Sequence, residues 1–214
     1  MQFQPKSLNN LNHSTDEKRE FQFSNDLECW QAFKRGNEAA FIHIYKQYFK
    51  RLLDYSAQYT VNKELVLDCI QDIFVELRKN RKNLSDTNSI LKYLLISLKR
   101  KIIYRLNQAK SLDLRHQKVE RFEIEYSAED YIVNRQISEE RNDRIKHAIS
   151  QLSERQREAI YCFYYQNMNY KDVADVMDLS STKSARNLIY KALGKLKISL
   201  VVDVFALIYM IHFV

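Results

Sequence analysis

Glycine and proline are almost missing from this chain of 214 residues, which has two glycines (Gly36 and Gly194) and one proline (Pro5). A glycine-rich phosphate loop, a dinucleotide-binding fingerprint and the tight turns of a β-sandwich all require more glycine than this. An all-β fold and most α/β enzyme folds are therefore nearly excluded. Because 45% of the residues are hydrophobic, the chain is globular rather than disordered, and we expect an all-helical protein.

Cysteine and histidine are few and scattered, which bears on metal sites and on the cellular compartment. The three cysteines, Cys29, Cys69 and Cys162, each lie in an apolar pattern of helical spacing, and none belongs to a metal-binding motif. The five histidines form no cluster. We therefore predict reduced core cysteines in a cytoplasmic protein, with no metal and no cofactor. The sequence contains no catalytic constellation, and the chain is not expected to be an enzyme.

Charge is distributed unevenly along the chain, whose net charge is +7. Residues 1–110 hold 19 basic and 12 acidic residues, residues 111–137 hold 4 and 6, and residues 138–214 hold 11 and 9. A basic first half, an acidic middle and a mildly basic end predict two domains and a linker. A basic surface favours a polyanionic partner, most often nucleic acid, although a merely solvated basic face has the same composition.

Helical periodicity predicts a first domain at residues 26–108, after a disordered tail at 1–25. Asp26 is the expected N-cap of a short first helix, and Asn62 is the expected N-cap of the third. Three longer helices are expected at about 38–59, 63–80 and 90–108. The segment 80–89 has turn composition and no apolar period, so we predict a loop there.

Regular helical patterning resumes at residue 138, after an acidic linker at 109–137. Ser153 and Gln156 form a capping box that begins a helix extending to about Asn167. The second domain is therefore placed at 138–198.

The end of the second domain has the pattern of a helix-turn-helix. A two-turn helix follows Asn169, a tight turn occupies 178–181, and a basic helix with Thr182 as its expected N-cap spans about 183–198. A helical hairpin with a solvated basic face is the alternative. We predict an all-α fold of two small helical domains joined by a linker, the second a helix-turn-helix (winged-helix-like) DNA-binding domain.

The tail at 199–214 is almost wholly apolar. Its 15 residues from Leu200 are fewer than the ~20 needed to cross a bilayer as a helix. Three interpretations remain: a final helix that packs on the second domain, an interfacial anchor, or a segment that binds a partner. We favour packing or partner binding, because an uncovered apolar tail would aggregate.

Three segments in this order resemble a known family: DCIQDIFVELRKN, YLLISLKRKIIYRL, and LSERQREAIYCFYYQNMNYKDVADVMDLSSTKSARNLIYKALGKL. The chain looks like an extracytoplasmic-function (ECF) sigma factor of the sigma-70 family. The similarity covers about 27–108, as sigma region 2, and 138–198, as sigma region 4. KSARNLIYKAL is especially similar to the versions found in Bacteroidetes.

The resemblance implies a surface for RNA polymerase on the third helix, where the family docks on the clamp helices of the β′ subunit. The matching residues share one face of the helix and are Asp68, Gln71, Asp72 and Glu76. A polar stripe on a helix that is buried on its other side is free for a partner. An ordinary solvated face is the alternative interpretation.

The loop 80–89 and the helix after it match the segment that opens and reads the −10 element. Melted DNA requires cations along its backbone and a pocket for an extruded base. The expected backbone contacts are Lys99, Arg100, Lys101 and Arg105, and the expected pocket residues are Asn83, Ser85, Asp86 and Asn88. Arg100 and Tyr104 depart from the family pattern, which usually has Asn and an acid there, so the −10 preference is expected to differ.

The 182–197 segment matches the helix that recognises the −35 element. The expected DNA-binding residues are Thr182, Lys183, Arg186, Asn187, Tyr190, Lys191 and Lys195. Arg pairs well with guanine and Asn with adenine, whereas Lys191 and Lys195 are expected to contact phosphates. Asp178 stands where the family turn usually has Gly, and the turn is one residue longer, so weak or altered −35 reading is expected.

The resemblance predicts a dissociable sigma factor that binds core RNA polymerase (its β and β′ subunits) and promoter DNA, melts the −10 element and starts transcription. An anti-sigma factor or another DNA-bound recruiting protein is the expected regulator, and no small-molecule substrate is expected. The linker acids are expected to run through the polymerase and mimic RNA charge, or to serve only solubility. The alternatives are a helix-turn-helix regulator that acts on duplex DNA without polymerase, and a membrane-attached interaction protein.

Overall fold

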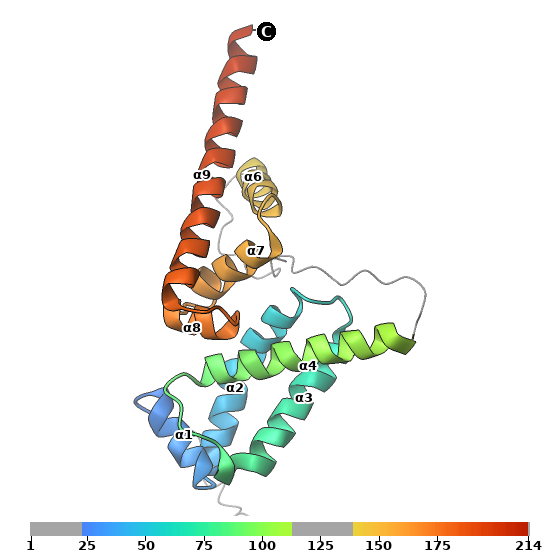
Figure 1. Cartoon of the computed structure of the whole chain (residues 1–214), viewed down its shortest axis with the longest axis vertical. Helices are drawn as coiled ribbons and strands as arrows, with labels where there is room; N and C mark the ends of the chain where they lie inside the picture. The colour runs from blue at the N-terminus through green and yellow to red at the C-terminus, as the bar shows by residue number, and fades with distance from the viewer. Residues whose placement is uncertain (1–22, 113–138, 214) are drawn as a thin grey trace, which may run out of the picture.

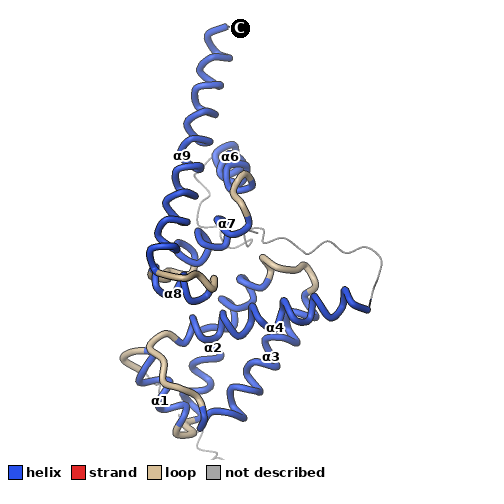
Figure 2. The backbone as a smooth tube through the Cα atoms, in the orientation of Figure 1, coloured by secondary structure: helices blue, strands red, loops and turns tan. Residues whose placement is uncertain are grey.

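The computed structural model describes residues 23–112 and 139–213, with side chains described over 23–108 and 143–199. These residues form helices and connecting loops and contain no strand (Figures 1 and 2). The all-helical prediction is confirmed. The disordered tail predicted at 1–25 and the linker predicted at 109–137 fall largely outside the described residues and stay predictions.

The first unit consists of α1 (Asp26–Lys34), α2 (Glu38–Ser56), α3 (Lys63–Asn80), the 3₁₀ turn η1 (Arg81–Asn83) and α4 (Ile90–Leu112). Its α4 packs across α1, α2 and α3, as Figure 1 shows. The largest fully buried side chains come from all four helices and are Trp30, Phe33, Ile44, Leu52, Tyr55, Ile70, Leu77, Ile90, Leu94, Leu95, Leu98 and Ile102. One bundle with one core therefore holds the predicted polymerase and −10 residues.

Asparagine side chains begin the first three helices of this unit. The N-cap of α1 is Asn25, whose side chain accepts a hydrogen bond from the backbone of Glu28 at 2.9 Å, so the assignment of Asp26 as the cap was wrong. Asn37 caps α2 and Asn62 caps α3, the latter as predicted. Gly36 precedes the α2 cap with φ +94°, a conformation that requires glycine.

The second unit consists of α6 (Glu139–Ser150), α7 (Glu154–Ile160), the π-helical turn η2 (Tyr161–Tyr165), α8 (Tyr170–Val176) and α9 (Thr182–Phe213). The capping box of Ser153 and Gln156 is confirmed at the start of α7. The helix predicted to extend to about Asn167 is confirmed to within two residues: α7 continues directly into the π-helical turn η2, and the chain then turns at Asn167, whose φ is +52°. Helices α6, α7 and α8 all pack on α9.

The last helix is longer than predicted. Instead of ending near residue 198, α9 continues to Phe213 and extends past the rest of the second unit (Figure 1). The side chains of 200–214 lie outside the described part, so packing or partner binding by the apolar tail stays a prediction. Among the described residues, no helix has the length and apolar character needed to span a membrane.

The two units are in contact. Helix α8 packs on α4, and buried side chains of both units belong to one continuous apolar cluster. The three cysteines are buried free thiols within it, which confirms their prediction as core residues. Sequence reasoning expected two domains joined by a linker and did not anticipate this direct contact.

Candidate nucleic-acid interface

The predicted polymerase surface lies on the solvent side of α3. The opposite side of this helix is buried and carries Val66, Cys69, Ile70, Ile73, Phe74 and Leu77. Asp68, Gln71 and Glu76 are exposed and Asp72 is half-buried, so the four predicted residues share one accessible face. The sequence pattern therefore predicted correctly that this face is accessible to solvent, and its role in polymerase binding stays a prediction.

Two of these four residues of α3, Asp72 and Glu76, form ion pairs with cations of α4. Lys101 Nζ lies 2.6 Å from Glu76 Oε1 and 3.6 Å from Asp72 Oδ2, and an Arg105 guanidinium nitrogen lies 3.1 Å from Asp72 Oδ2. Partial burial acts to lower the pKa of Lys101, but its bonds to Glu76 and Asp72 hold the pKa above the ordinary lysine value. The predicted polymerase face and the predicted −10 face therefore share ion pairs, which neither motif indicated.

The four cations predicted for the −10 backbone differ in their surroundings. Lys99 Nζ lies 2.6 Å from Glu158 Oε1 of the second unit, and Lys101 and Arg105 pair with α3. Arg100 is exposed, and within residues 23–108 and 143–199 no ion pair of its guanidinium is found. Three of the four predicted cations therefore have carboxylate partners in this structure, and their role in DNA binding stays a prediction.

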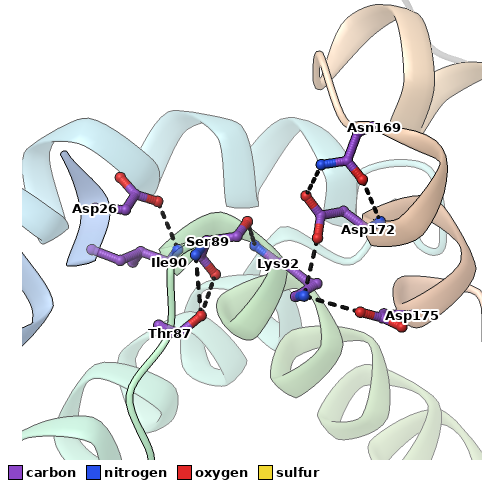
Figure 3. A network of polar contacts seen from close by, with 8 residues as sticks. All are labelled: Asp26, Thr87, Ser89, Ile90, Lys92, Asn169, Asp172 and Asp175. Carbon is purple, nitrogen blue, oxygen red and sulfur yellow. Dashed lines mark hydrogen bonds and ion pairs between the residues drawn. The ribbon is translucent and has the colours of Figure 1, made fainter.

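The loop before α4 is anchored by the first helix. Trp30 Nε1 donates a 2.9 Å hydrogen bond to the carbonyl of Ser85, and Lys34 pairs with Asp86 at 2.6 Å. Asp26 accepts a 2.7 Å hydrogen bond from the backbone of Ile90, and Thr87 bonds to Ser89, so the loop enters α4 in a fixed geometry (Figure 3). Asp26 and Trp30 are positioning residues that the sequence motifs did not reveal.

The predicted base-pocket residues sit on this anchored loop. Asn83, Ser85, Asp86 and Asn88 are all exposed, as an interaction with an extruded base requires. The hydrogen bond and charge of Lys34 lower the pKa of Asp86 below its ordinary value. The four residues are thus accessible on one short segment, and their role in base binding stays a prediction.

The turn of the predicted helix-turn-helix has a left-handed residue. Asp178 has φ +52°, and the backbone nitrogen of Leu179 donates to the carbonyl of Ala174 at 2.8 Å. Aspartate tolerates this conformation where glycine would be usual, as expected from the sequence. The N-cap of α9 is Ser181, which accepts from the backbone nitrogen of Ser184 at 3.2 Å, so its assignment to Thr182 was wrong.

The outward face of α9 gathers the predicted −35 residues. Its inner face is buried through Ala185, Ile189 and Ala192. The exposed residues are Thr182, Lys183, Arg186, Asn187, Tyr190, Lys191 and Lys195. Every predicted −35 residue is therefore accessible along one side of a helix, as major-groove reading requires.

Tyr170, at the start of α8, supports the outer face of α9. The Arg186 guanidinium lies over its ring, with 5.6 Å between the guanidinium carbon and the ring centroid. Hydrogen bonding to Tyr190 raises the pKa of Tyr170, and Phe163 stacks on the ring with centroids 4.8 Å apart. Tyr170 therefore restrains two of the predicted base-reading side chains, and no pattern in the sequence pointed to it.

The described residues hold no group of three or more His, Cys, Asp and Glu side chains that could bind a metal ion.

Comparison with known proteins finds one matching family model. Residues 142–196 match the family model described as "Sigma-70, region 4". No curated protein sequence matches the chain.

Solved structures are similar over most of the chain. One is CnrH in complex with the cytosolic domain of CnrY, with 20% identity, a TM-score of 0.54, and coverage of 83% of this chain and 98% of that chain. Another is the sigma factor RpoE in complex with the anti-sigma factor NepR from Bartonella quintana, with 17% identity, a TM-score of 0.55, and coverage of 76% and 98%. At these identities the likeness is one of fold, and it extends well beyond residues 142–196.

Proposed function

We propose that the chain is an RNA polymerase sigma factor of the ECF type, because residues 142–196 match the family model of sigma-70 region 4. It binds core polymerase, carries it to promoters and opens the −10 DNA. The observation that carries the proposal is the outer face of α9, where all the predicted −35 residues are exposed within the domain that matches region 4. The Bacteroidetes likeness of this helix stays a prediction.

The first unit supplies the two remaining surfaces of a sigma factor. We assign core binding to the outer face of α3, with Asp68 and Gln71 as its unpaired polar groups among the described residues. We assign the −10 strand to the segment 80–89 and α4, where Arg100 is an exposed cation with no ion pair among the described residues. These roles rest on exposure and charge together with the resemblance of the motifs.

The partners follow from this function. They are the β and β′ subunits of core polymerase, promoter DNA, and a regulator that is either an anti-sigma factor or a DNA-bound recruiting protein. The RpoE structure contains an anti-sigma factor, which supports the first kind of regulator. The protein acts in the cytoplasm as a regulatory subunit rather than as an enzyme.

A helix-turn-helix regulator that works without polymerase is the second candidate. It requires α6 to α9 but has no need of the α1 to α4 bundle. The fold likeness to CnrH and RpoE covers 83% and 76% of this chain, which favours the sigma factor.

Affinity purification of the tagged protein from its native cell tests the proposal. We expect β and β′ to be recovered with the wild-type chain and to be depleted with the double variant Asp68→Lys/Gln71→Lys. Recovered holoenzyme should then start transcription on sheared genomic DNA at discrete sites. Binding of duplex DNA with no recovery of β and β′ would instead support the regulator.

A further inference from the structure

A cleft lies where the two units meet, and none of its lining residues is among those predicted to bind polymerase or DNA. Its volume is about 350 Å³, at the lower end of the range for small-molecule pockets. The first unit contributes residues of α1, α2 and the start of α4, and the second contributes the segment from η2 to α8. Two charged side chains of the first unit, Asp26 and Arg51, line it together.

Arg51 is a half-buried cation whose hydrogen-bond acceptors are neutral. Its Nε donates to Gln166 Oε1 at 2.9 Å, and an Nη nitrogen donates to the Gln166 carbonyl at 2.5 Å. In the part of the chain that the structure describes, Arg51 forms no ion pair. Burial lowers the pKa of Arg51 below the ordinary arginine value, although the charge of Asp26 opposes this effect. A carboxylate bound in the cleft would therefore supply a missing counter-charge.

Asp26 is the complementary case, a carboxylate whose donors are neutral. It accepts hydrogen bonds from Tyr48 OH and from the backbone nitrogen of Ile90, both at 2.7 Å. Burial and the bond to Asp26 raise the pKa of Tyr48, so its hydroxyl remains a donor at neutral pH. No ion pair of Asp26 is found within residues 23–108 and 143–199. The cleft thus holds one cation and one anion, each without a charged partner at bonding distance.

The other lining groups leave room for a ligand to bond. Two of the five N–H donors of Arg51 are used by Gln166, so the others remain available. The side-chain amide of Asn167 has no hydrogen-bond partner among the described residues. Asp172, on the other side of Ser89 from Asp26 in Figure 3, is already neutralised by Lys92 at 3.0 Å.

This pattern of charge selects among small ligands. The fork of N–H donors on Arg51 matches the geometry of a carboxylate. A dianionic phosphate is disfavoured, because the carboxylates of Asp26 and Asp172 would repel it. A ligand with both a carboxylate and an ammonium group satisfies both unpaired charges, and Leu91 and Met168 offer apolar contact to the rest of it.

We propose that the cleft is a binding site for a small zwitterion of the α-amino acid class, whose carboxylate pairs with Arg51 and whose ammonium group pairs with Asp26. The ligand is bound and not converted, so it is an effector rather than a substrate. Because it contacts both units, its binding is coupled to the contact between them. The inference adds a small-molecule ligand to the proposed function and does not depend on it.

Calorimetric titration of the full-length chain tests the proposal. The probes are the common α-amino acids, added one at a time at millimolar concentration. We expect at least one to bind saturably and to raise Tm as its concentration rises, since a ligand that binds only the folded state stabilises that state. An even, non-saturating response to all of them would contradict a built site.

The tightest-binding amino acid is then compared with two analogues on the wild-type chain. One is the acid that lacks its amino group, and the other is the amine that lacks its carboxylate. Each should bind roughly tenfold or more weakly than the amino acid, because each leaves Asp26 or Arg51 without a counter-charge. This comparison requires no variant, so it is decisive even where a substitution impairs folding.

Two substitutions assign the ends of the ligand. Arg51→Gln should weaken the amino acid roughly tenfold to a hundredfold and leave the amine nearly unchanged. Asp26→Asn, which keeps an acceptor oxygen, should weaken the amino acid and the amine but not the deaminated acid. The matched controls are Lys46→Gln, on the same helix as Arg51, and Asp178→Asn. They make the same changes in charge at exposed positions that do not line the cleft.

The proposal is overturned if no α-amino acid binds the folded wild-type chain, if the amino acid and its two analogues bind alike, or if Arg51→Gln binds as tightly as Lys46→Gln. All of these measurements use the free protein. They leave the proposed sigma function to be judged separately, by recovery of β and β′ and by transcription, so the two can fail independently.

Discussion

The cations of α4 and those of α9 look alike in the sequence but differ in the folded chain. On α4, Lys99, Lys101 and Arg105 face carboxylates of α7 or α3, because α4 lies between acidic neighbours. On α9 the outer face has no helix over it in the described part of the chain, and all the predicted residues are exposed. Regularly spaced basic residues therefore indicate a charged face of a helix. The helices packed beside it determine whether that face is accessible to DNA.

The largest expected effect tests the buried partner of Lys99. Glu158→Leu removes an acceptor shared by Lys99, Tyr55 and Tyr59, and we expect it to lower the free energy of unfolding by about 2–4 kcal/mol. The cost arises because a partly buried ammonium group loses its counter-charge. Urea denaturation, followed by circular dichroism, measures it.

Asp175→Ala is the control for this prediction. Its carboxylate also pairs across the units but is 43% exposed, so its loss should cost less than about 1 kcal/mol. The double variant Lys99→Met/Glu158→Leu should recover most of the stability, because neither charge remains buried alone. Equal losses for Glu158→Leu and Asp175→Ala would contradict the distinction between buried and exposed pairs.

The second prediction concerns the free cations of α9. Arg186 lies near the start of the helix, where base edges are met, and Arg186→Ala should relax selection at one −35 position by roughly 1–3 kcal/mol. Lys195→Ala should weaken binding to all promoter sequences about equally, because contacts to phosphates do not distinguish between bases. Selection from a randomised upstream region, with purified holoenzyme, distinguishes the two.

Tyr170 allows this prediction to be sharpened. Tyr170→Phe keeps the ring beneath Arg186 and should preserve selection at that position, whereas Tyr170→Ala should relax it with little change at phosphate-contacted positions. If Arg186→Ala and Lys195→Ala behave alike and no motif is recovered, α9 touches only phosphates. Another DNA-bound protein must then recruit the polymerase to its promoters.

The same contrast shows what the sequence could predict. Apolar periodicity and the caps Asn62 and Ser153 located α3 and α7, since these signals depend on residues within one turn of each other. The outer face of α9 was also predicted from the local spacing of apolar residues within the helix. The bond from Lys99 to Glu158 joins residues 59 positions apart. Lys99 was predicted only as a DNA contact, and Glu158 belonged to no predicted site. Contacts of this kind depend on how the two units pack, which no local pattern encodes.

The third prediction compares free and paired residues on α3. Asp68→Lys, at an exposed position, should weaken binding to core polymerase by roughly fivefold to tenfold, since it reverses a charge on the proposed docking face. Asp72→Lys/Glu76→Lys should weaken it too but also free Lys101 and Arg105. Helicity should stay intact in both. Titration with labelled core polymerase measures the affinities.

Asp54→Lys on α2 is the control for charge reversal, because its only ion pair among the described residues is the exposed contact with Lys50. It should leave core binding within twofold of wild type, as expected for a partly exposed site on another helix than the proposed docking face. Unchanged affinity for Asp68→Lys would remove α3 from the docking surface.

The smallest expected effect compares two neighbouring cations of α4. Arg100 is exposed, whereas Lys101 pairs with Glu76 and Asp72. Arg100→Ala should reduce the salt dependence of single-stranded DNA binding by about 0.7 in log–log slope, the value of one phosphate contact. Lys101→Ala should reduce it less, because DNA must first displace the two carboxylates.

In the Asp72→Asn/Glu76→Gln background that competition disappears, and Lys101→Ala should then match Arg100→Ala. Equal slopes for the two single variants in the wild-type background would mean that DNA displaces the carboxylate partners of α4 at no cost. The ion pairing that distinguishes the cations of α4 from those of α9 would then have no effect on DNA binding.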